Sequence, residues 1–344
     1  MKTKNVSELL PPSNQERHLK SEVQRLGQII ARRKLESGQI ADAMTDVLAA
    51  VPLATPPKLA FRASGPSKVA SPVTHCVHIT DWHIGEKVVA EHIEEFNAAN
   101  YTLACERITR LGQNLVAKTQ LTRHAYHVNE CHVIGTADWI SGDIHDELIR
   151  TNEFPAPVQA VKSGFLLGAF LVGLSAHFQK VKVDLITAGN HDRITRKPQS
   201  ADGGLNSWGY VVCEIARQHV AACPNIQIRI HHGLSAVVDV AGQRYLIAHG
   251  DGIKGTWGIP FYGIERKKQK EAMARMNMDP SKHFDKIVIG HFHTALNPEH
   301  WLIGGSLTGT NEFDHKEGRA SRPHQTSWFI HPKHGEFDWT RWWL

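Results

Sequence analysis

Five short polar clusters in this sequence contain the residue types that bind divalent metal ions. Each cluster directly follows a short apolar segment. In chain order they are Asp81-Trp82-His83, Gly135-Thr136-Ala137-Asp138, Gly189-Asn190-His191-Asp192, His249-Gly250-Asp251 and Gly290-His291-Phe292-His293. Mixed carboxylate, amide and imidazole donors suit Mn²⁺, Fe²⁺ or Zn²⁺. Two such ions about 3.5–4 Å apart are the usual arrangement for in-line displacement at phosphorus, with a carboxylate bridging them.

The elements that must position these clusters are the apolar segments before them. We predict strands at 74–80, 131–135, 181–187, 245–248 and 286–289, and helices at 90–118, 158–177, 207–222 and 263–276. This alternation favours an α/β domain. In α/β sheets, ligands bind outside the carboxyl ends of the strands. We therefore expect the clusters to lie together, although they are far apart in the sequence.

The rest of the chain suggests three parts. Residues 1–50 are predicted to be a helical extension, because apolar residues recur at helical spacing from about residue 15. Residues 51–72 contain five prolines and are predicted to be a linker. The main domain is then 73–344, and its last part, 301–344, is predicted to be rich in strands.

Net charge, cysteine spacing and the length of the apolar stretches indicate which classes of protein are expected. The 344 residues carry a net charge of +5, a mild basic excess that suits an anionic partner. The five cysteines include no CxxC pair, so neither a disulfide framework nor a zinc ribbon is expected. The N-terminus has no secretory apolar region, and the apolar stretch 164–178 is shorter than the ~20 residues needed to span a bilayer. We expect a cytoplasmic protein without a membrane partner.

The five clusters, in the order D-x-H, D, G-N-H-D, H and G-H-x-H, resemble the calcineurin-like metallophosphoesterase superfamily over about residues 74–310. The resemblance implies a four-layer α-β-β-α sandwich, here with the N-terminal helical extension. It implies one metal ion on Asp81, His83 and His293 and a second on Asn190, His249 and His291, with Asp138 bridging both. His191 would face the scissile phosphate and, as an imidazolium whose ring Asp192 orients, protonate the leaving group.

The bridging carboxylate has an alternative. The family's second motif is usually Gly-Asp, whereas here Asp138 follows Ala137, and Gly142-Asp143 comes slightly later. We favour Asp138 because it lies three residues beyond the predicted strand. Asp143 remains the alternative.

The substrate class follows from a second, looser resemblance. The stretches ADWISGDIHDEL, HGDGIKGTWGIPFYGIERKK and GSLTGTNEF are similar to phosphoesterases encoded by tailed phages, which are distantly similar to the double-strand-break-repair nucleases. This implies a DNA nuclease in phage DNA metabolism or repair, using two divalent ions, with Mn²⁺ first and Fe²⁺, Zn²⁺ or Mg²⁺ as alternatives. The rival functions are a phosphatase, a cyclic-nucleotide phosphodiesterase, or a phosphoesterase-like subunit of a replication or packaging complex.

Further residues are candidates for binding partners. DNA contacts are expected from His145, Arg193, Arg196 and Lys197, for which a polar helix start or a solvated surface is the alternative. Residues 15–50 could bind a protein partner or a second copy of the chain. His75 and His78 alternate along the first predicted strand and are expected to be core or edge residues.

Overall fold

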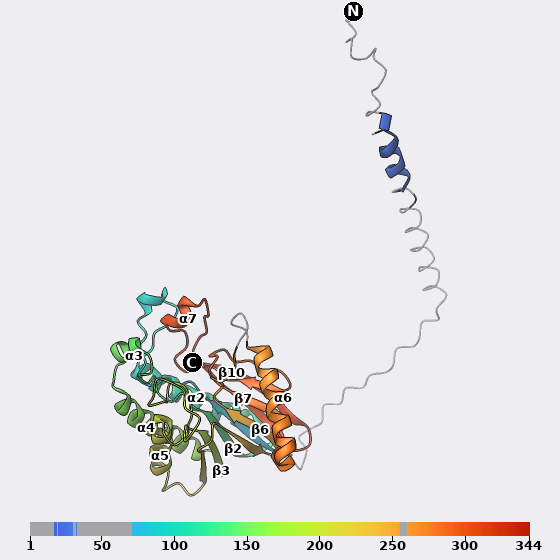
Figure 1. Ribbon diagram of the computed structural model, residues 1–344. Coiled ribbons are helices and arrows are strands. Elements are labelled where there is room, and N and C mark those ends of the chain that lie inside the picture. Colours follow the sequence, from blue (N-terminus) through green and yellow to red (C-terminus); the bar gives the residue numbers. More distant parts are fainter. Residues whose placement is uncertain (1–16, 19, 30–31, 33–70, 255–259) are drawn as a thin grey trace, which may run out of the picture. The chain divides into compact units, whose positions relative to one another are not determined.

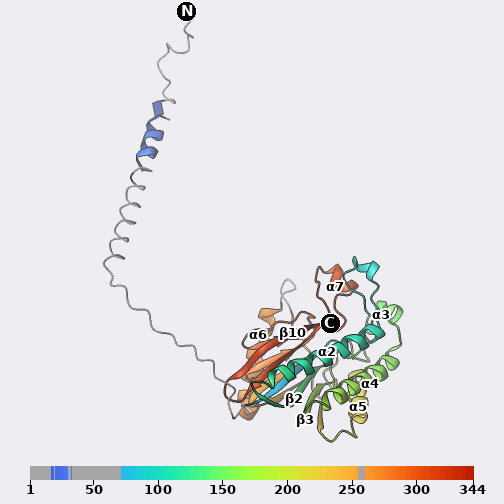
Figure 2. The same cartoon turned by 180° about the vertical axis from the view of Figure 1, so that it is seen from behind.

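The computed structural model describes residues 17–18, 20–29, 32, 71–254 and 260–344 (Figures 1 and 2). The chain divides into two units, Met1–Ala63 and Ser64–Leu344. The described residues of the first unit are helical, and Val23, Leu26 and Ile29 on them are exposed. The rest of the predicted extension and nearly all of the predicted linker lie outside the described residues.

The larger unit contains a six-stranded sheet with the order β10-β9-β1-β2-β3-β4. Strands β1, β2, β3 and β4 are parallel, and β9 and β10 continue the sheet in antiparallel pairing. The bounds of these strands are β1 Pro72–Ile79, β2 His127–Thr136, β3 Lys180–Ile186, β4 Ile226–His231, β9 His324–His331 and β10 Gly335–Trp343.

A second sheet has four strands in the order β5-β6-β7-β8. Here β6, β7 and β8 are parallel to one another, and β5 pairs with β6 in the antiparallel sense. The bounds are β5 Ser235–Val240, β6 Gln243–Ala248, β7 Lys286–Ile289 and β8 Trp301–Ile303.

Helices and short turns complete the unit. The α-helices are α2 Tyr101–Thr122, α3 Asp146–Thr151, α4 Ala156–Ser175, α5 Trp208–His219, α6 Phe261–Met278 and α7 Glu312–Lys316, and the 3₁₀ turns are η2 Ala90–Ile93 and η3 Pro280–Lys282. Figures 1 and 2 show α2, α4 and α5 on one face of the six-stranded sheet and α6 beside the four-stranded sheet.

Three apolar clusters hold these layers together. The largest joins α2, α4 and α5 to the six-stranded sheet, with Leu111, Leu171 and Val183 among its members. A second lies between the two sheets and includes Ile134 and Tyr245. A third packs α6 on the outer face of the four-stranded sheet. Burying apolar side chains on both faces of each sheet is the main favourable contribution to this fold.

The α/β class predicted from the sequence is confirmed, and the five predicted strands match β1, β2, β3, β6 and β7 within a few residues. The predicted helix at 90–118 is wrong in its first part. A short 3₁₀ turn ends where Glu94 and Glu95 adopt left-handed backbone angles, and α2 begins only after Asn100, whose side chain accepts a hydrogen bond from the Leu103 amide.

Among the described residues, α4 is the one helix long and apolar enough to cross a membrane by length and composition. Half of that stretch is buried within the fold, and its large buried apolar side chains, Leu167, Phe170, Leu171 and Leu174, belong to the cluster shared with α2 and α5. Helix α4 therefore has the packing of a core helix.

The buried histidine His75 makes the stability of the fold depend on pH. Its ring lies against Phe329, and its two nitrogens contact the hydroxyls of Thr119 and Ser327 at 2.8 and 3.0 Å. Burial, reinforced by the charge of Lys118, lowers the pKa of His75 to about 3. In the unfolded protein, His75 has the ordinary histidine pKa of about 6.5. Between about pH 3 and pH 6.5 the unfolded protein therefore binds more protons than the folded protein does.

We therefore predict that the stability His75 confers is complete above about pH 6.5 and is lost as the pH falls toward 3. Its share of the change in unfolding free energy between about pH 7 and pH 5 is about 2 kcal/mol. Urea unfolding of the wild type and His75→Gln at both pH values measures this share. An equal change in both proteins would contradict the prediction.

Candidate metal centre

The five polar clusters all follow strand ends in the structure. Strands β1, β2 and β3 are neighbours in one sheet, and β6 and β7 are neighbours in the other, all parallel within their sheets. The candidate ligands begin one to four residues beyond the last residue of each strand. Backbone hydrogen bonds of 3.1 Å, from Asp81 N to Ala137 O and from His83 N to Asp138 O, join the first two loops.

The backbone at these ligands is unusual. Five of them have φ angles between 44° and 68°, in the left-handed region that residues other than glycine rarely adopt; they are Asp81, His83, Asp138, His291 and His293. Such conformations cost free energy and persist where the surrounding structure enforces them, often at functional sites. Here they turn the chain sharply at the strand ends, which places consecutive side chains in one region.

Two glycines allow the loops to approach one another. A Cβ atom at Gly189 would lie 2.1 Å from Asp138 Oδ1, and one at Gly290 would lie 2.3 Å from Asp81 Oδ2. Neither distance is compatible with a side chain. The glycines in the G-N-H-D and G-H-x-H clusters are therefore needed for the two carboxylates to occupy their places.

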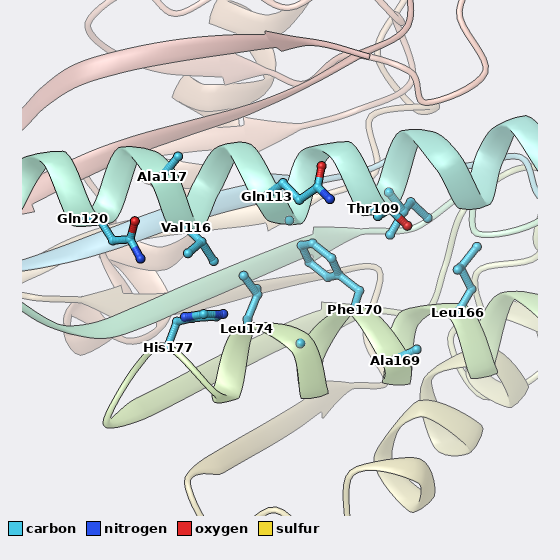
Figure 3. A pocket seen from close by; sticks show the side chains of 13 residues that line it. Thr109, Gln113, Val116, Ala117, Gln120, Leu166, Ala169, Phe170, Leu174 and His177 are labelled. Carbon is cyan, nitrogen blue, oxygen red and sulfur yellow. The ribbon is translucent and has the colours of Figure 1, made fainter.

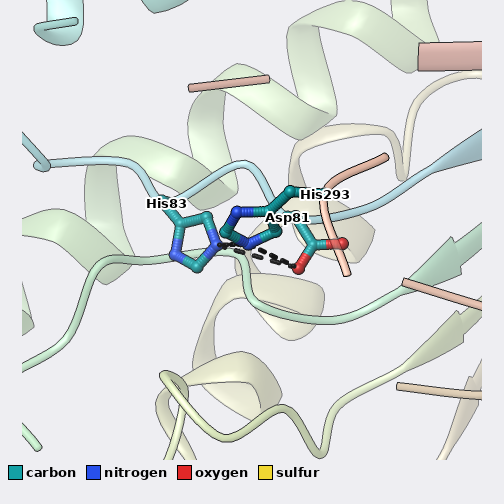
Figure 4. A group of neighbouring side chains, drawn as sticks. All are labelled: Asp81, His83 and His293. Atoms are coloured by element: carbon teal, nitrogen blue, oxygen red, sulfur yellow. Dashed lines mark hydrogen bonds and ion pairs between the residues drawn. The ribbon is translucent and has the colours of Figure 1, made fainter. Parts of the chain in front are cut away.

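The first group of convergent donors is Asp81, His83 and His293, whose donor atoms all lie within 4.8 Å of one another (Figure 4). Asp81 Oδ1 lies 3.7 Å from His83 Nε2 and 3.5 Å from His293 Nε2. The two Nε2 atoms are 3.2 Å apart. Two imidazole nitrogens and a carboxylate oxygen that point at one location can together hold a divalent ion.

The second group is Asp138, His249 and His291, whose donor atoms also lie within 4.8 Å of one another. Asp138 Oδ2 lies 2.9 Å from His249 Nε2, which is also 2.9 Å from Asn190 Oδ1. A third group, His83, Asp138 and His191, shares members with the other two sets. Asp138 thus lies where the two sets meet, whereas Asp143, the alternative, is exposed.

The electrostatics of the site favour positive charge. Burial alone would raise the pKa of Asp81, but the neighbouring His293 and His83 rings hold it well below its usual range. Burial also opposes the charged form of His249, yet Asp138 beside it raises its pKa to about 10. The pKa of His293 is likewise raised, by Asp314 and Asp81. Each buried carboxylate therefore favours a cation next to it, either a proton on histidine or a metal ion.

The outer nitrogens of the histidines fit a metal centre. His249 Nδ1 donates to Thr136 O at 2.9 Å, and His293 Nδ1 lies 3.1 Å from Asp314 Oδ2. Such contacts fix ring orientation and direct Nε2 toward the ion. His83 Nδ1 is buried and has no hydrogen-bond partner among the described residues. The donor types and their second contacts thus suit divalent ions.

His191 and Asp192 are arranged differently from the expectation. Nδ1 of His191 donates to Ser141 O at 2.7 Å, so this carbonyl orients the ring. Asp192 instead accepts the backbone amides of Asp138, Trp139 and Ile140 at 2.8, 3.0 and 3.3 Å. The expected Asp192–His191 contact is wrong: Asp192 fixes the loop that carries Asp138.

The charge of His191 also differs from the expectation. Burial and the neighbouring His83 lower its pKa to about 3, so the ring is neutral near pH 7 rather than an imidazolium. Its ring centroid lies 4.5 Å from that of His83. Any proton that His191 moves must therefore be taken up during the reaction.

A cavity of about 420 Å³ opens onto the donor groups. Its walls include residues that sequence analysis missed, namely Glu86, Leu148, Asn311, Phe313, Asp314 and Arg319. No sequence pattern marks Asp314 as part of the site, because its contact with His293 joins two loops that are separate in the sequence. The Asn311 cap of α7, which accepts the Asp314 amide at 2.9 Å, was a local signal only for a helix start.

The predicted substrate residues are only partly near this cavity. His145 lines it, with its ring 5.9 Å from that of His191. Arg193 lines a separate cavity of about 220 Å³ and donates to Asn190 O at 3.0 Å. Arg196 is exposed and paired with Asp146, and Lys197 is exposed.

Another cavity, of about 480 Å³, lies between α2 and α4 (Figure 3). Val116 on α2 and Phe170 and Leu174 on α4 line it, and none of the candidate ligands does. Its apolar walls suit packing rather than catalysis.

No protein-family model matches the sequence, and no curated protein matches it. Solved structures with partial similarity include the protein of unknown function AQ665 from Aquifex aeolicus, at a TM-score of 0.29 and 13% identity, covering 66% of this chain and 82% of that chain. Another is Chaetomium thermophilum Vps29, at a TM-score of 0.26 and 11% identity, covering 79% of this chain and 95% of that chain.

The contact between Asp314 and His293 predicts an effect on metal affinity. Asp314→Asn keeps the size of the side chain but removes the charge that polarises the His293 ring. We expect Mn²⁺ to bind about 10–100-fold more weakly, as measured by titration calorimetry. The exposed Asp202→Asn is the matched control and should bind Mn²⁺ as the wild type does. Unchanged affinity in Asp314→Asn would contradict the prediction.

Proposed function

We propose that this protein is a two-metal phosphodiesterase of the calcineurin-like metallophosphoesterase type, acting on DNA with Mn²⁺ in phage DNA metabolism or repair. The observation that carries the proposal is the convergence of two donor groups, Asp81-His83-His293 and Asp138-His249-His291, which a third group containing His83 and Asp138 connects. The layer order of helices, two facing sheets and helix α6 agrees with the sandwich that the resemblance implies.

The residues have distinct tasks in this proposal. Asp138 would bridge two ions, one also held by Asp81, His83 and His293 and the other by Asn190, His249 and His291. Divalent ions bound there would neutralise the phosphate oxygens and activate water for attack on phosphorus. His191, whose Nδ1 donates to Ser141 O, presents Nε2 as the atom that takes up a proton and then releases it. An anionic phosphodiester beside the ring favours its protonated form, which can protonate the leaving oxygen.

The described walls of the cavity lack a cluster of cationic side chains that would bind a phosphate monoester, and this favours a phosphodiester as the substrate. A phosphate monoester carries two negative charges, and the cavity residues include a single arginine, Arg319, and no lysine. Three carboxylates that are not proposed ligands, Glu86, Glu147 and Asp314, also line the cavity. This charge balance suits the single charge of a diester.

The test compares linear DNA, bis-p-nitrophenyl phosphate and p-nitrophenyl phosphate with added Mn²⁺. We expect Mn²⁺-dependent cleavage of both diesters and slower turnover of the monoester. His191→Ala should lower kcat by about 10²–10⁴-fold while metal binding persists. The exposed His127→Ala is the control and should be fully active. Turnover of the monoester alone would overturn the proposal.

A further inference from the structure

One wall of the metal-centre cavity has side chains that the proposed chemistry does not use. This wall is formed by α7 and the turn after it, and Phe313 and Arg319 are its exposed members. The residue Phe313 is 55% exposed, and the side chain of Arg319 is 47% exposed. Both line the cavity that contains His83, Asp138 and His191. An exposed aromatic ring in a cavity wall offers apolar surface to a ligand, because burying that surface on binding is favourable.

The wall is attached to the metal centre at several points. Asn311 Nδ2 donates to Glu86 Oε1 at 2.7 Å, and Ser321 Oγ donates to the carbonyl of His293 at 3.0 Å. Asp314, between the two exposed residues, contacts the His293 ring. The position of Phe313 relative to the metal centre is therefore fixed by the fold and not by a free loop.

Phe313 and Arg319 form one unit. The guanidinium carbon of Arg319 lies 5.1 Å from the centroid of the Phe313 ring, a cation–π distance. Arg319 N donates to Asp314 O at 2.8 Å, and its Nε is 3.8 Å from Asp314 Oδ1. That ion pair is long, so the guanidinium retains donors for a ligand. The unit combines an aromatic surface with a permanent positive charge.

Other lining residues add apolar surface. Phe292 and Leu148 also line the cavity, whose volume of about 420 Å³ is in the range of sites for small ligands. An aromatic surface, one guanidinium and a nearby site for a phosphodiester match one chemical class, a nucleotide. Aromatic rings bind unpaired bases by stacking, largely independently of base identity.

We propose that Phe313 and Arg319 form a nucleotide subsite, in which Phe313 stacks on one unpaired base of the substrate and Arg319 faces its phosphate. The inference rests on the proposed phosphodiesterase activity and specifies its substrate. Because a base paired within a duplex cannot stack on Phe313, the nucleotide at this subsite comes from a single strand or an open chain end. The subsite selects nucleoside diesters over simple diesters.

Hydrolysis of thymidine 5′-p-nitrophenyl phosphate and of methyl p-nitrophenyl phosphate with Mn²⁺ tests the subsite. Both release p-nitrophenolate, but only the first carries a base. Phe313→Ala should lower kcat/KM for the thymidine substrate about tenfold, mainly through KM, and leave the methyl substrate within about twofold. Phe313→Trp should restore the preference. The control Phe165→Ala, an exposed phenylalanine on α4 outside this cavity, should behave as the wild type does.

Binding provides a readout that does not depend on turnover. In calorimetry with Mn²⁺, the wild type should bind thymidine 5′-monophosphate more tightly than methyl phosphate, and Phe313→Ala should lose this difference. Arg319→Ala should weaken both ligands, whereas the control Arg217→Ala, on the exposed face of α5, should weaken neither. Equal binding of the two ligands by the wild type would overturn the subsite. Absence of turnover with the binding difference intact would overturn the proposed activity alone.

Discussion

Two buried carboxylates, Asp81 and Asp138, determine how the rest of the site is arranged. Both are almost completely inaccessible to water, and each lies against histidine nitrogens. Burying a negative charge is costly unless a positive charge and hydrogen bonds accompany it. Asp81 accepts hydrogen bonds from the Thr80 hydroxyl and the His291 amide, and Asp138 accepts one from the His191 amide. The remaining requirement is a cation between the carboxylates and the imidazoles.

The two-sheet fold meets this requirement by geometry. Parallel strands end at a common edge of each sheet, and the facing sheets bring β1, β2 and β3 close to the ends of β6 and β7. Left-handed backbone angles and the glycines at 189 and 290 let the loops meet closely. Asp192 adds three hydrogen bonds to the Asp138 loop. The strain in the ligand loops is thus balanced by contacts beyond the ligands themselves.

The sequence was most informative where chemistry follows directly on a strand. Asp81, Asp138 and the histidines at 249, 291 and 293 were identifiable because each comes after an apolar strand, and the structure brings them together. Contacts between distant loops could not be predicted from the sequence. Neither the contact of Asp314 with His293 nor the hydrogen bond from His191 to the Ser141 carbonyl produces a local sequence pattern. The prediction that Asp192 orients His191 rested on their being neighbours in the sequence. In the structure, Asp192 instead accepts hydrogen bonds from the loop that carries Asp138. In 90–118, helix-forming composition hid the turn at Glu94 and Glu95.

In the proposed two-metal centre, Asp138 would bind both ions. Mn²⁺ stoichiometry, measured by elemental analysis after equilibrium dialysis of folded protein, tests it most directly. We expect two ions per chain in the wild type and in Asp143→Asn, and loss of two-ion binding in Asp138→Asn. Two ions retained in Asp138→Asn, with binding lost in Asp143→Asn, would contradict it.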